Sequence, residues 1–275
     1  MRVELQDVRH VYAPGTPFEV EALRGVSLAV EPDEVLGIIG GTGSGKSTLV
    51  QHLNLLLEPT GGRVLVDGVD ARTLRRSELR RRVGLVFQFP EAALFAPTVA
   101  EDVAFAPRRL GMDEDGVRQR VRQTLELLGA GHLEQRSPFA LSGGEKRRVA
   151  IAGVLAMAPE VLVLDEPAAG LDPATREGLL GVVRALGDGG TSVVLVSHDL
   201  DEVAEVADRV CVLEEGRVRA VGTPEEVFYA HLEASQAPTS VRVVAPLKEE
   251  YPEIGSPVRF EQTLAALKGL LEGRR

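Results

Sequence analysis

The sequence predicts an α/β fold with a mostly parallel β-sheet, and three observations support this. Short apolar runs alternate with longer amphipathic segments through the second half of the chain, which is typical of a parallel sheet covered by helices on both faces. A block from about residue 89 to 158 is mostly helical in pattern. Residues 3–31 alternate apolar and polar side chains, as half-buried strands do. We therefore expect an N-terminal antiparallel β subdomain and a helical subdomain inserted into the core.

Composition excludes several classes of protein. The chain has 275 residues, of which 44% are hydrophobic, and a net charge of −10. It is long enough for a full core, and its acidic balance argues against general binding to a nucleic-acid backbone, which requires an excess of Lys and Arg. The single cysteine, Cys211, lies in the apolar run Val210–Leu213 and is expected to be buried. Neither a disulfide framework nor a zinc cluster can be built from it.

The sequence contains no expected membrane span. Residues 1–5 lack the apolar core of a signal peptide. The best apolar segment, Ile151–Leu164, is interrupted by Pro159 and Glu160 and falls short of the roughly 18–20 residues of a spanning helix. We expect an intracellular chain that could dock on a membrane partner.

The N-terminal region is predicted to form short strands beside a nucleotide site. Val3–Leu5 and Val26–Val30 alternate apolar and polar residues, and Ala13–Gly15 is a turn between them. Tyr12 stands directly before that turn. Its ring either stacks on a purine base or is an ordinary strand aromatic, and the residues alone leave both interpretations open.

A glycine-rich loop at residues 40–48 fits the pattern G-x-x-x-x-G-K-[ST]. It lies between the apolar run Val35–Ile39 and the periodic segment Leu49–Leu57, which predicts strand, loop and helix. Backbone N–H groups of such a loop, together with the helix N-terminus, form a concave site for phosphate. Lys46 is expected to contact the outer phosphates and Ser47 to ligate Mg²⁺. The predicted phosphate-binding residues are Gly40, Gly41, Thr42, Gly43, Ser44, Gly45, Lys46, Ser47 and Thr48. With this loop, the predicted α/β fold is that of a P-loop NTPase core.

The region after the predicted P-loop helix contains a basic cluster and a second strand. Six arginines lie between Arg72 and Arg82, around a short helix. Such a run is either a solvated surface or a contact with phosphate or lipid head groups. Val83–Phe87 has the composition of a buried strand and ends on Gln88, and Val117–Leu128 has strong helical periodicity.

Polar side chains follow several predicted strands directly. Asp165 and Glu166 follow Val161–Leu164, and His198 comes just after Val193–Val196. A third strand is expected at 209–213, with helices at 173–186 and 200–207. Because ligands of parallel sheets bind beyond the carboxyl ends of the strands, we expect these side chains, Gln88 and the glycine loop to meet at one edge.

Each side chain at that edge has a chemical and a structural interpretation. Asp165 is expected to hold Mg²⁺ through water, and Glu166 to accept a proton from the attacking water. The alternative is that the two acids decorate a helix N-terminus. His198 either donates to the γ-phosphate or is structural. Gln88 either ligates the metal and senses the γ-phosphate or caps a strand.

A second anion site is predicted at Leu141, Ser142, Gly143, Gly144 and Glu145, which open a helix running to Ala158. Ser142 and Glu145 have the spacing of a capping box. Two glycines are nevertheless poor residues for a first helical turn, and they make sense if backbone N–H groups must approach an anion. No second P-loop is present, so this site would serve the nucleotide of another subunit.

Together these segments resemble the ATP-binding cassette (ABC) ATPase family over residues 2–230. Six motifs occur in the family's order: Walker A (Gly40–Ser47), the Q-loop (Gln88), the signature motif (Leu141–Glu145), Walker B with its catalytic glutamate (Val161–Glu166), the D-loop (Ala169–Asp172) and the switch histidine (His198). The resemblance implies a head-to-tail dimer with two ATP molecules between Walker A of one subunit and the signature motif of the other. It also implies that Asp172 joins the nucleotide-binding residues and that Tyr12 stacks on adenine.

A narrower resemblance is to the ATPases of energy-coupling factor (ECF) transporters, which import cobalt, nickel and vitamins. It rests on Val86–Glu91, Leu94–Phe95, Thr98–Val99, Asp102–Phe105 and Leu141–Met157. Three positions depart from the usual pattern: Gly41, where His is frequent, Ala168, where Thr or Ser is usual, and Asp33, where Gly is common. None of these bears a group that the chemistry needs.

The narrower resemblance implies an ATP-hydrolysing subunit that energises membrane import. Its expected partners are a second ATPase subunit, in a homodimer or a heterodimer, an integral-membrane T-component and, through it, a substrate-binding S-component. It would lie peripherally on the cytoplasmic face of the membrane. Residues 1–228 would form the ATPase domain, and 229–275 are expected to be an extension that adds dimer contacts. The alternatives are another class of ABC transporter, a soluble ABC ATPase acting on nucleic acid or ribosomes, and a P-loop kinase, which would leave Leu141–Glu145 unexplained.

Overall fold

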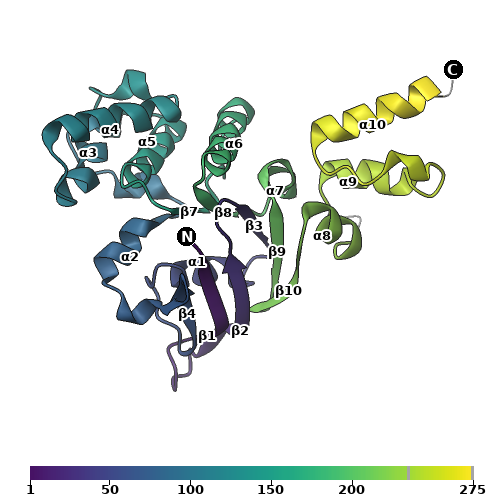
Figure 1. Ribbon diagram of the computed structural model, residues 1–275, viewed down its shortest axis with the longest axis horizontal. Coiled ribbons are helices and arrows are strands. Elements are labelled where there is room, and N and C mark those ends of the chain that lie inside the picture. The colour runs from purple at the N-terminus through teal and green to yellow at the C-terminus, as the bar shows by residue number, and fades with distance from the viewer. Residues whose placement is uncertain (234–235, 274–275) are drawn as a thin grey trace.

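Two β-sheets form the centre of the computed structural model, which describes residues 1–233 and 236–273 (Figure 1). The larger sheet has the strand order β10-β9-β3-β8-β7-β6, in which β9 through β6 run parallel and β10 pairs antiparallel with β9. Its strands are β3 (Val35–Ile39), β6 (Val83–Val86), β7 (Val161–Asp165), β8 (Ser192–Val196), β9 (Arg209–Glu214) and β10 (Arg217–Gly222). The mostly parallel sheet that the sequence predicts is confirmed.

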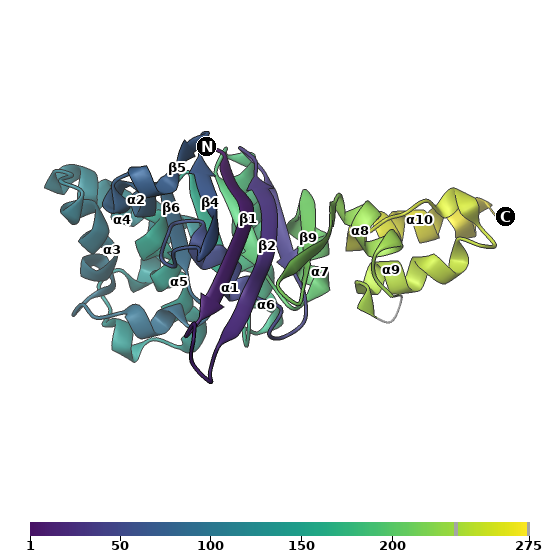
Figure 2. The same ribbon diagram turned by 90° about the horizontal axis from the view of Figure 1, so that it is seen from below.

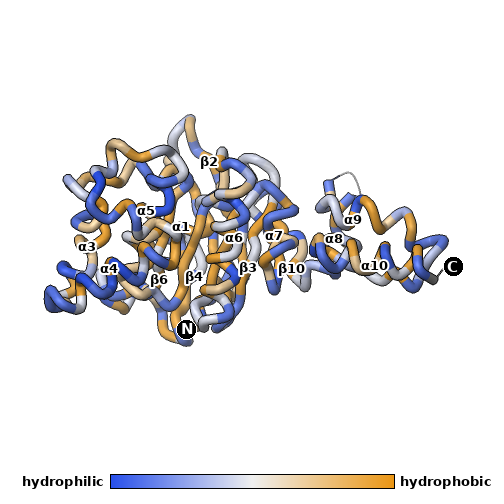
Figure 3. Tube along the Cα trace, turned by 90° about the horizontal axis from the view of Figure 1, so that it is seen from above, coloured by the Kyte–Doolittle hydropathy of each residue, from blue (hydrophilic) through white to orange (hydrophobic). Residues whose placement is uncertain are grey.

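The inner strands β3, β7 and β8 of the larger sheet are buried along their whole length, which explains why they are nearly continuous apolar runs. In β3, Val35 and Ile39 belong to one hydrophobic cluster, whereas Leu36 and Ile38 belong to a second cluster on the opposite face. Figure 3 shows the corresponding hydrophobic stretches in the middle of the molecule. Cys211 lies in the second cluster and is fully buried, as predicted, and burial raises the pKa of its thiol to about 12.

The smaller sheet is antiparallel, with the strand order β2-β1-β4-β5. Its strands are β1 (Val3–Tyr12), β2 (Val20–Val30), β4 (Gly61–Val66) and β5 (Val69–Asp70). It confirms the N-terminal β subdomain, although β1 and β2 are longer than the short alternating runs suggest. Tyr12 pairs with Val20 at the end of this ladder, beside the predicted turn.

Of the helices between β5 and β7, α2 packs against β6, whereas α3, α4 and α5 pack on one another as a group beside the sheets (Figure 1). They are α2 (Arg76–Arg82), α3 (Val99–Arg109), α4 (Glu114–Leu127) and α5 (Gly143–Leu155). In the basic cluster, Arg72 pairs with Asp70, Arg76 with Glu58, and Arg82 with both Asp67 and Glu160. These ion pairs favour the interpretation of the cluster as a solvated surface.

The P-loop helix is shorter than its periodicity predicts. α1 spans Lys46–His52, whereas the apolar pattern continues to Leu57. The side chain of Asn54 accepts a hydrogen bond from the N–H of Leu56 at 3.1 Å, and Leu55 adopts a positive φ of 50°. A local side-chain bond of this kind competes with helix continuation, and a positive φ ends it.

The C-terminal residues form a helical extension beyond β10 (Figure 2). The remaining helices of the core are α6 (Pro173–Asp188) and α7 (Leu200–Val206), and those of the C-terminal region are α8 (Pro224–Ala230), α9 (Thr239–Val244) and α10 (Phe260–Gly273). Thr239 bonds through its backbone N–H and its hydroxyl to the carboxylate of Asp201 in α7. Within the described residues, no helix has the length and apolar character required to cross a membrane.

Candidate functional site

The glycine loop links β3 to α1 and leaves its backbone N–H groups without side-chain caps. Gly45 is the N-cap residue of α1, where no side chain accepts a hydrogen bond, and the first turn carries no acidic residue. Gly45 has φ 103°, and a Cβ there would lie 2.7 Å from the carbonyl oxygen of Ala22. Only glycine fits this position without strain. The helix N-terminus therefore stays accessible to an anion.

Two polar side chains of the loop are arranged for phosphate. Lys46 is 8% exposed, and its Nζ donates to the carbonyl oxygens of Gly40 at 2.7 Å and Gly41 at 3.0 Å. Burial lowers the pKa of Lys46, although the nearby carboxylates of Glu166 and Asp165 act in the opposite direction. The hydroxyl of Ser44 is buried and has no protein partner. A buried hydroxyl of this kind requires an acceptor, and a phosphate oxygen would supply one.

Ser47 and Asp165 provide oxygen atoms of the kinds that Mg²⁺ binds. The hydroxyl of Ser47 donates to the carboxylate of Asp165, which lies at the buried end of β7. Burial raises the pKa of Asp165, and the Ser47 hydrogen bond and the Lys46 charge only partly oppose this. Among the described residues no three acidic, His or Cys side chains gather as a metal cluster. A hydroxyl and a carboxylate suit Mg²⁺, which keeps several water ligands and binds few protein groups.

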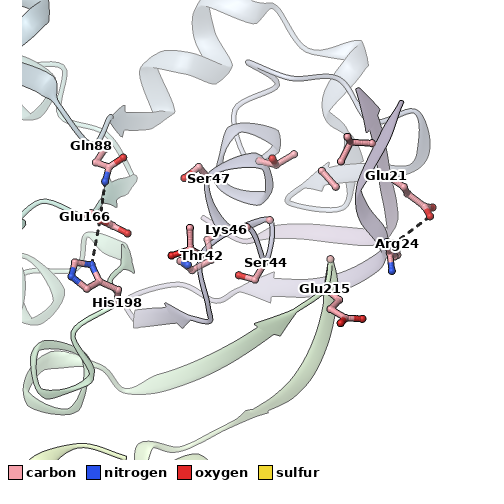
Figure 4. A pocket seen from close by; sticks show the side chains of 16 residues that line it. Glu21, Arg24, Thr42, Ser44, Lys46, Ser47, Gln88, Glu166, His198 and Glu215 are labelled. Atoms are coloured by element: carbon pink, nitrogen blue, oxygen red, sulfur yellow. Dashed lines mark hydrogen bonds and ion pairs between the residues drawn. The ribbon is translucent and has the colours of Figure 1, made fainter. Parts of the chain in front are cut away.

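Glu166 is held by two side chains from neighbouring strand ends (Figure 4). Its Oε2 accepts a hydrogen bond from Gln88 Nε2 at 2.9 Å, and His198 Nδ1 lies 3.3 Å from the same oxygen. Glu166 has φ 50°, and its N–H donates to the carbonyl of Val196 at 2.9 Å. No helix begins until Pro173, so the alternative in which the two acids decorate a helix N-terminus is wrong.

These groups line one cavity of about 850 Å³, which has the size of a nucleotide site. Gln88, Glu166 and His198 lie at one end, and the glycine loop lies in the middle (Figure 4). The far end is lined by Glu21, Arg24 and Glu215. The predicted convergence of the strand ends and the loop is thus present in the structure. The lining residues are Val20, Glu21, Ala22, Arg24, Thr42, Gly43, Ser44, Gly45, Lys46, Ser47, Thr48, Gln88, Glu166, His198, Glu215 and Gly216.

Tyr12 lies beside this cavity and does not line it. Its hydroxyl is 3.1 Å from Thr48 Oγ1, and its ring packs edge-on against His10 with centroids 4.5 Å apart. Its ladder partner Val20 does line the cavity. Tyr12 is 40% exposed, so its ring remains accessible at the border of the site.

The second predicted anion site lies apart from the cavity. Ser142 caps α5, and the reciprocal hydrogen bonds with Glu145 form a capping box, so the helix-capping interpretation is correct as far as it goes. A Cβ at Gly143 would have no neighbour within 4 Å, whereas one at Gly144 would lie 3.4 Å from Thr175 Cγ2 and 3.6 Å from Leu171 Cδ2. Gly143 therefore borders open space, and Gly144 is in van der Waals reach of side chains from the segment before α6 and its first turn.

Asp172 also lies outside the cavity lining. Its side chain accepts a hydrogen bond from the N–H of Thr175 at 3.0 Å and caps α6. Hydrogen bonds from Thr175 hold the pKa of Asp172 below its ordinary value. Asp172 and the signature segment Leu141–Glu145 therefore both lie outside the lining of the cavity.

Sequence reasoning missed the residues at the far end of the cavity. Glu21 and Arg24 come from β2, and Glu215 and Gly216 come from the turn between β9 and β10. The N–H of Arg24 donates to the carbonyl of Gly216 at 2.8 Å, which joins the two sheets there. No spacing in the sequence marks this contact. The alternation of Val26–Val30 predicted the second half of β2 but not the residues from Val20 to Arg24 that reach the cavity.

The fold and the site define a P-loop protein whose glycine loop lines a cavity of nucleotide size. The family model described as "ABC transporter" matches residues 23–169. The chain is 49% identical to the energy-coupling factor transporter ATP-binding protein EcfA2 of Symbiobacterium thermophilum, over 100% of this chain and 98% of that protein. It is 46% identical to EcfA2 of Clostridium perfringens, over 83% of this chain and 82% of that protein.

Solved structures agree with these relatives. The structure of cbiO1 from Clostridium perfringens, described as part of the ABC transporter complex cbiONQ, has a TM-score of 0.77 and 36% identity, covering 92% of this chain and 96% of that one. The dimeric ABC transporter cassette MJ0796 has a TM-score of 0.72 and 30% identity, covering 80% of this chain and 98% of that one. The chain belongs to the ABC transporter family and, within it, to the energy-coupling factor transporter ATP-binding proteins. It is an ATP-hydrolysing subunit of a membrane transporter.

Proposed function

We propose that the chain hydrolyses Mg²⁺-bound ATP in the cavity between the glycine loop and Glu166. The observation that carries this is the shared Glu166 oxygen, on which Gln88 and His198 converge next to the phosphate loop. Residues 40–48 would bind the phosphates. Ser47 and Asp165, with Gln88, would hold Mg²⁺, which when bound neutralises charge on the phosphate oxygens.

In this proposal Glu166 accepts the proton of the attacking water. A positioned general base contributes roughly 10²–10⁴ in rate. The hydrogen bond from Gln88 fixes the direction of the carboxylate, and His198 lies close enough to orient the same water or a γ-phosphate oxygen. Lys46 would place its buried positive charge against the outer phosphates, where a low local dielectric strengthens the attraction.

The signature segment Leu141–Glu145 and Asp172 would act on the nucleotide of a second subunit. Both lie away from the chain's own cavity, and the space before Gly143 is unfilled. A head-to-tail pair brings this surface over the partner's phosphates. Tyr12 would stack on adenine from the border of the cavity, where its ring is exposed.

The exposed aromatic side chains of this transporter subunit support contact with an integral-membrane partner. Exposed phenylalanines surround the Q-loop and the helical subdomain, which suits contact with an integral-membrane T-component. They are Phe87, Phe89, Phe95, Phe105 and Phe139. A substrate-binding S-component would join through the T-component, with a vitamin or a transition metal as cargo. The ATPase would then lie on the cytoplasmic face of the membrane.

We propose that residues 1–228 act as the ATPase domain, with the helical subdomain at about 89–158, and that 229–275 add contacts between subunits. In α10, Phe260, Leu264 and Leu271 are exposed. An amphipathic helix with exposed apolar residues of this kind is suited to burial against another chain. The Thr239–Asp201 hydrogen bonds would hold the extension in position for that contact.

The test is purification of the chain from native membranes in mild detergent, followed by ATPase assays across a dilution series. We expect an integral-membrane protein to co-purify and turnover per molecule to fall when the complex dissociates. Recovery of the chain bound to RNA or DNA without a membrane partner would contradict the proposal. Constant turnover per molecule at dilutions where only monomers exist would also contradict it.

A further inference from the structure

A buried arginine of α5 contacts the loop that follows the catalytic carboxylate. Arg147 is 5% exposed. Its Nη1 donates to the carbonyl oxygens of Pro167, at 3.3 Å, and of Ala169. Both carbonyls belong to the segment directly after Glu166. One guanidinium group therefore ties this segment to the helix whose first turn carries Ser142.

The same guanidinium reaches the segment after Gln88. Its Nη2 lies 3.5 Å from Glu91 Oε1, and Glu91 is the one carboxylate in the described part of the chain that pairs with Arg147. Burying a guanidinium is costly unless it is paired and hydrogen-bonded, because it stays charged. Glu91 and the two carbonyls compensate this charge. Arg147 Nε and Glu91 Oε2 are buried without any protein partner, so the pair is incompletely satisfied.

The segment that Arg147 holds is strained and carries few bonds of its own. Glu166 has φ 50°, a conformation that a non-glycine residue keeps only when its surroundings impose it. Two backbone hydrogen bonds lie within the segment: Ala169 N–H donates to Glu166 O at 3.3 Å, and Leu171 N–H to Ala168 O at 3.1 Å. The carbonyls of Pro167 and Ala169 fall within this turn, so their bonds to Arg147 restrain it.

We propose that Arg147 is a positioning residue for the Glu166 carboxylate and that Glu91 sets its orientation. The junction formed by Arg147, Glu91 and the carbonyls of Pro167 and Ala169 joins the Q-loop segment, the loop after Walker B and the signature helix. It touches neither ATP nor the attacking water. The inference rests on the proposed role of Glu166 as the base.

Such a junction should affect the chemical step more than nucleotide binding. A displacement of a catalytic group by about 1 Å can cost about 10² in rate, whereas the phosphate loop is built from a different segment. Removing the guanidinium should therefore lower kcat and leave the KM for ATP nearly unchanged. Lysine keeps the charge but has no planar fork to reach two carbonyls and a carboxylate together, so it should restore only part of the activity.

The experiment compares Arg147→Met, Arg147→Lys and Glu91→Gln in the assembled complex with the parent. For Arg147→Met we expect kcat to fall by about 10-fold to 10²-fold, with KM and the affinity for a fluorescent ATP analogue within about twofold. Glu91→Gln should lower kcat less, and its effect should nearly vanish in the Arg147→Met background, because the two residues act as a pair. The matched control is Arg148→Met, the next residue of α5, which pairs with no carboxylate in residues 1–233 and 236–273.

Three results would overturn the inference: an Arg147→Met enzyme with kcat within twofold of the parent, a loss that appears entirely in KM, or independent effects of Glu91→Gln and Arg147→Met. Thermal unfolding of each variant separates loss of folding from loss of positioning, and Arg147→Lys and Glu91→Gln remain informative if Arg147→Met does not fold. If Glu166→Gln keeps full turnover, the proposed role of Glu166 as the base is wrong, and the inference about Arg147 falls with it. If Glu166→Gln is inactive and Arg147→Met is normal, only the junction is refuted.

Discussion

Gln88 donates a hydrogen bond to Oε2 of Glu166 at 2.9 Å, although the two residues are 78 positions apart in the chain. The bond connects the ends of β6 and β7, which are neighbours in the parallel sheet. It fixes the carboxylate at the edge of the nucleotide cavity, beside His198. In our proposal the Q-loop segment around Gln88 lies near the membrane partner. One hydrogen bond would therefore link that contact to Glu166, the proposed base.

Replacing the proposed base should separate binding from hydrolysis. Glu166→Gln keeps the shape of the side chain but cannot take a proton, so turnover should fall by roughly 10²–10⁴. Affinity for ATP, measured by equilibrium binding of a fluorescent analogue, should stay within a few-fold. Glu177→Gln, an exposed carboxylate on α6, serves as the control. Hydrolysis by Glu166→Gln within a few-fold of the parent would remove Glu166 from this role.

Mixing two inactive variants tests whether the site is shared between two copies of this chain. Glu166→Gln and Ser142→Arg should each be inactive alone. In a head-to-tail pair that contains one of each, one site combines the intact cavity of one copy with the intact signature segment of the other. If subunits exchange at random, half of the pairs are mixed, and each mixed pair has one intact site out of two. The mixture should therefore recover about a quarter of the parent activity. If the two variants form mixed pairs and ATP hydrolysis is still absent, the idea that the site is shared between two copies would be wrong.

The role of Tyr12 can be tested with two substitutions that separate its ring from its hydroxyl. Stacking of a base on an aromatic ring is worth about 1–3 kcal/mol, so Tyr12→Ala should weaken ATP binding by roughly 5-fold to 150-fold. Tyr12→Phe removes only the hydroxyl bond to Thr48 and should change the affinity little. Isothermal titration calorimetry of the two variants provides the measurement. Equal affinities for Tyr12→Ala and the parent would favour the ordinary strand aromatic.

His52 should make the stability of the protein depend on pH. It is fully buried, with Nδ1 bonded to the carbonyl of Thr48 and Nε2 3.2 Å from His10 Nδ1. Burial lowers its pKa from 6.5 to about 4. The unfolded chain therefore binds more protons between these values, so this contribution to stability is fully present above pH 6.5 and is lost as the pH falls toward 4. The total is at most about 3 kcal/mol.

Urea unfolding at several pH values would measure this effect. The loss of stability between pH 6.5 and 4 should be smaller in His52→Leu than in the parent, whatever the absolute stability of the variant. His132→Asn, which changes an exposed histidine, should keep the parent's pH dependence. An unchanged slope in His52→Leu would assign the acid sensitivity to other groups.

Local sequence patterns were enough to predict most elements of this fold. The strand, glycine loop and helix around Lys46 follow from apolar runs and spacing, and so do the capping box of Ser142 and the buried strand that contains Cys211. The prediction failed at the end of α1, where the apolar pattern continues past His52. The Asn54 hydrogen bond and the positive φ of Leu55 decide that boundary, and an average periodicity does not report either one.

By itself, then, the sequence determined which side chains end up at strand ends, because a strand and the residue that follows it are local features of the chain. Only the tertiary structure decided which strands are neighbours, and hence that Gln88 and His198 meet on one oxygen of Glu166. The same holds for Arg24 beside Gly216 and for Arg147 beside Glu91. Such contacts depend on strand order and on how helices pack over the sheet. Those are set by burial of the whole core, a property that no short segment of the chain contains.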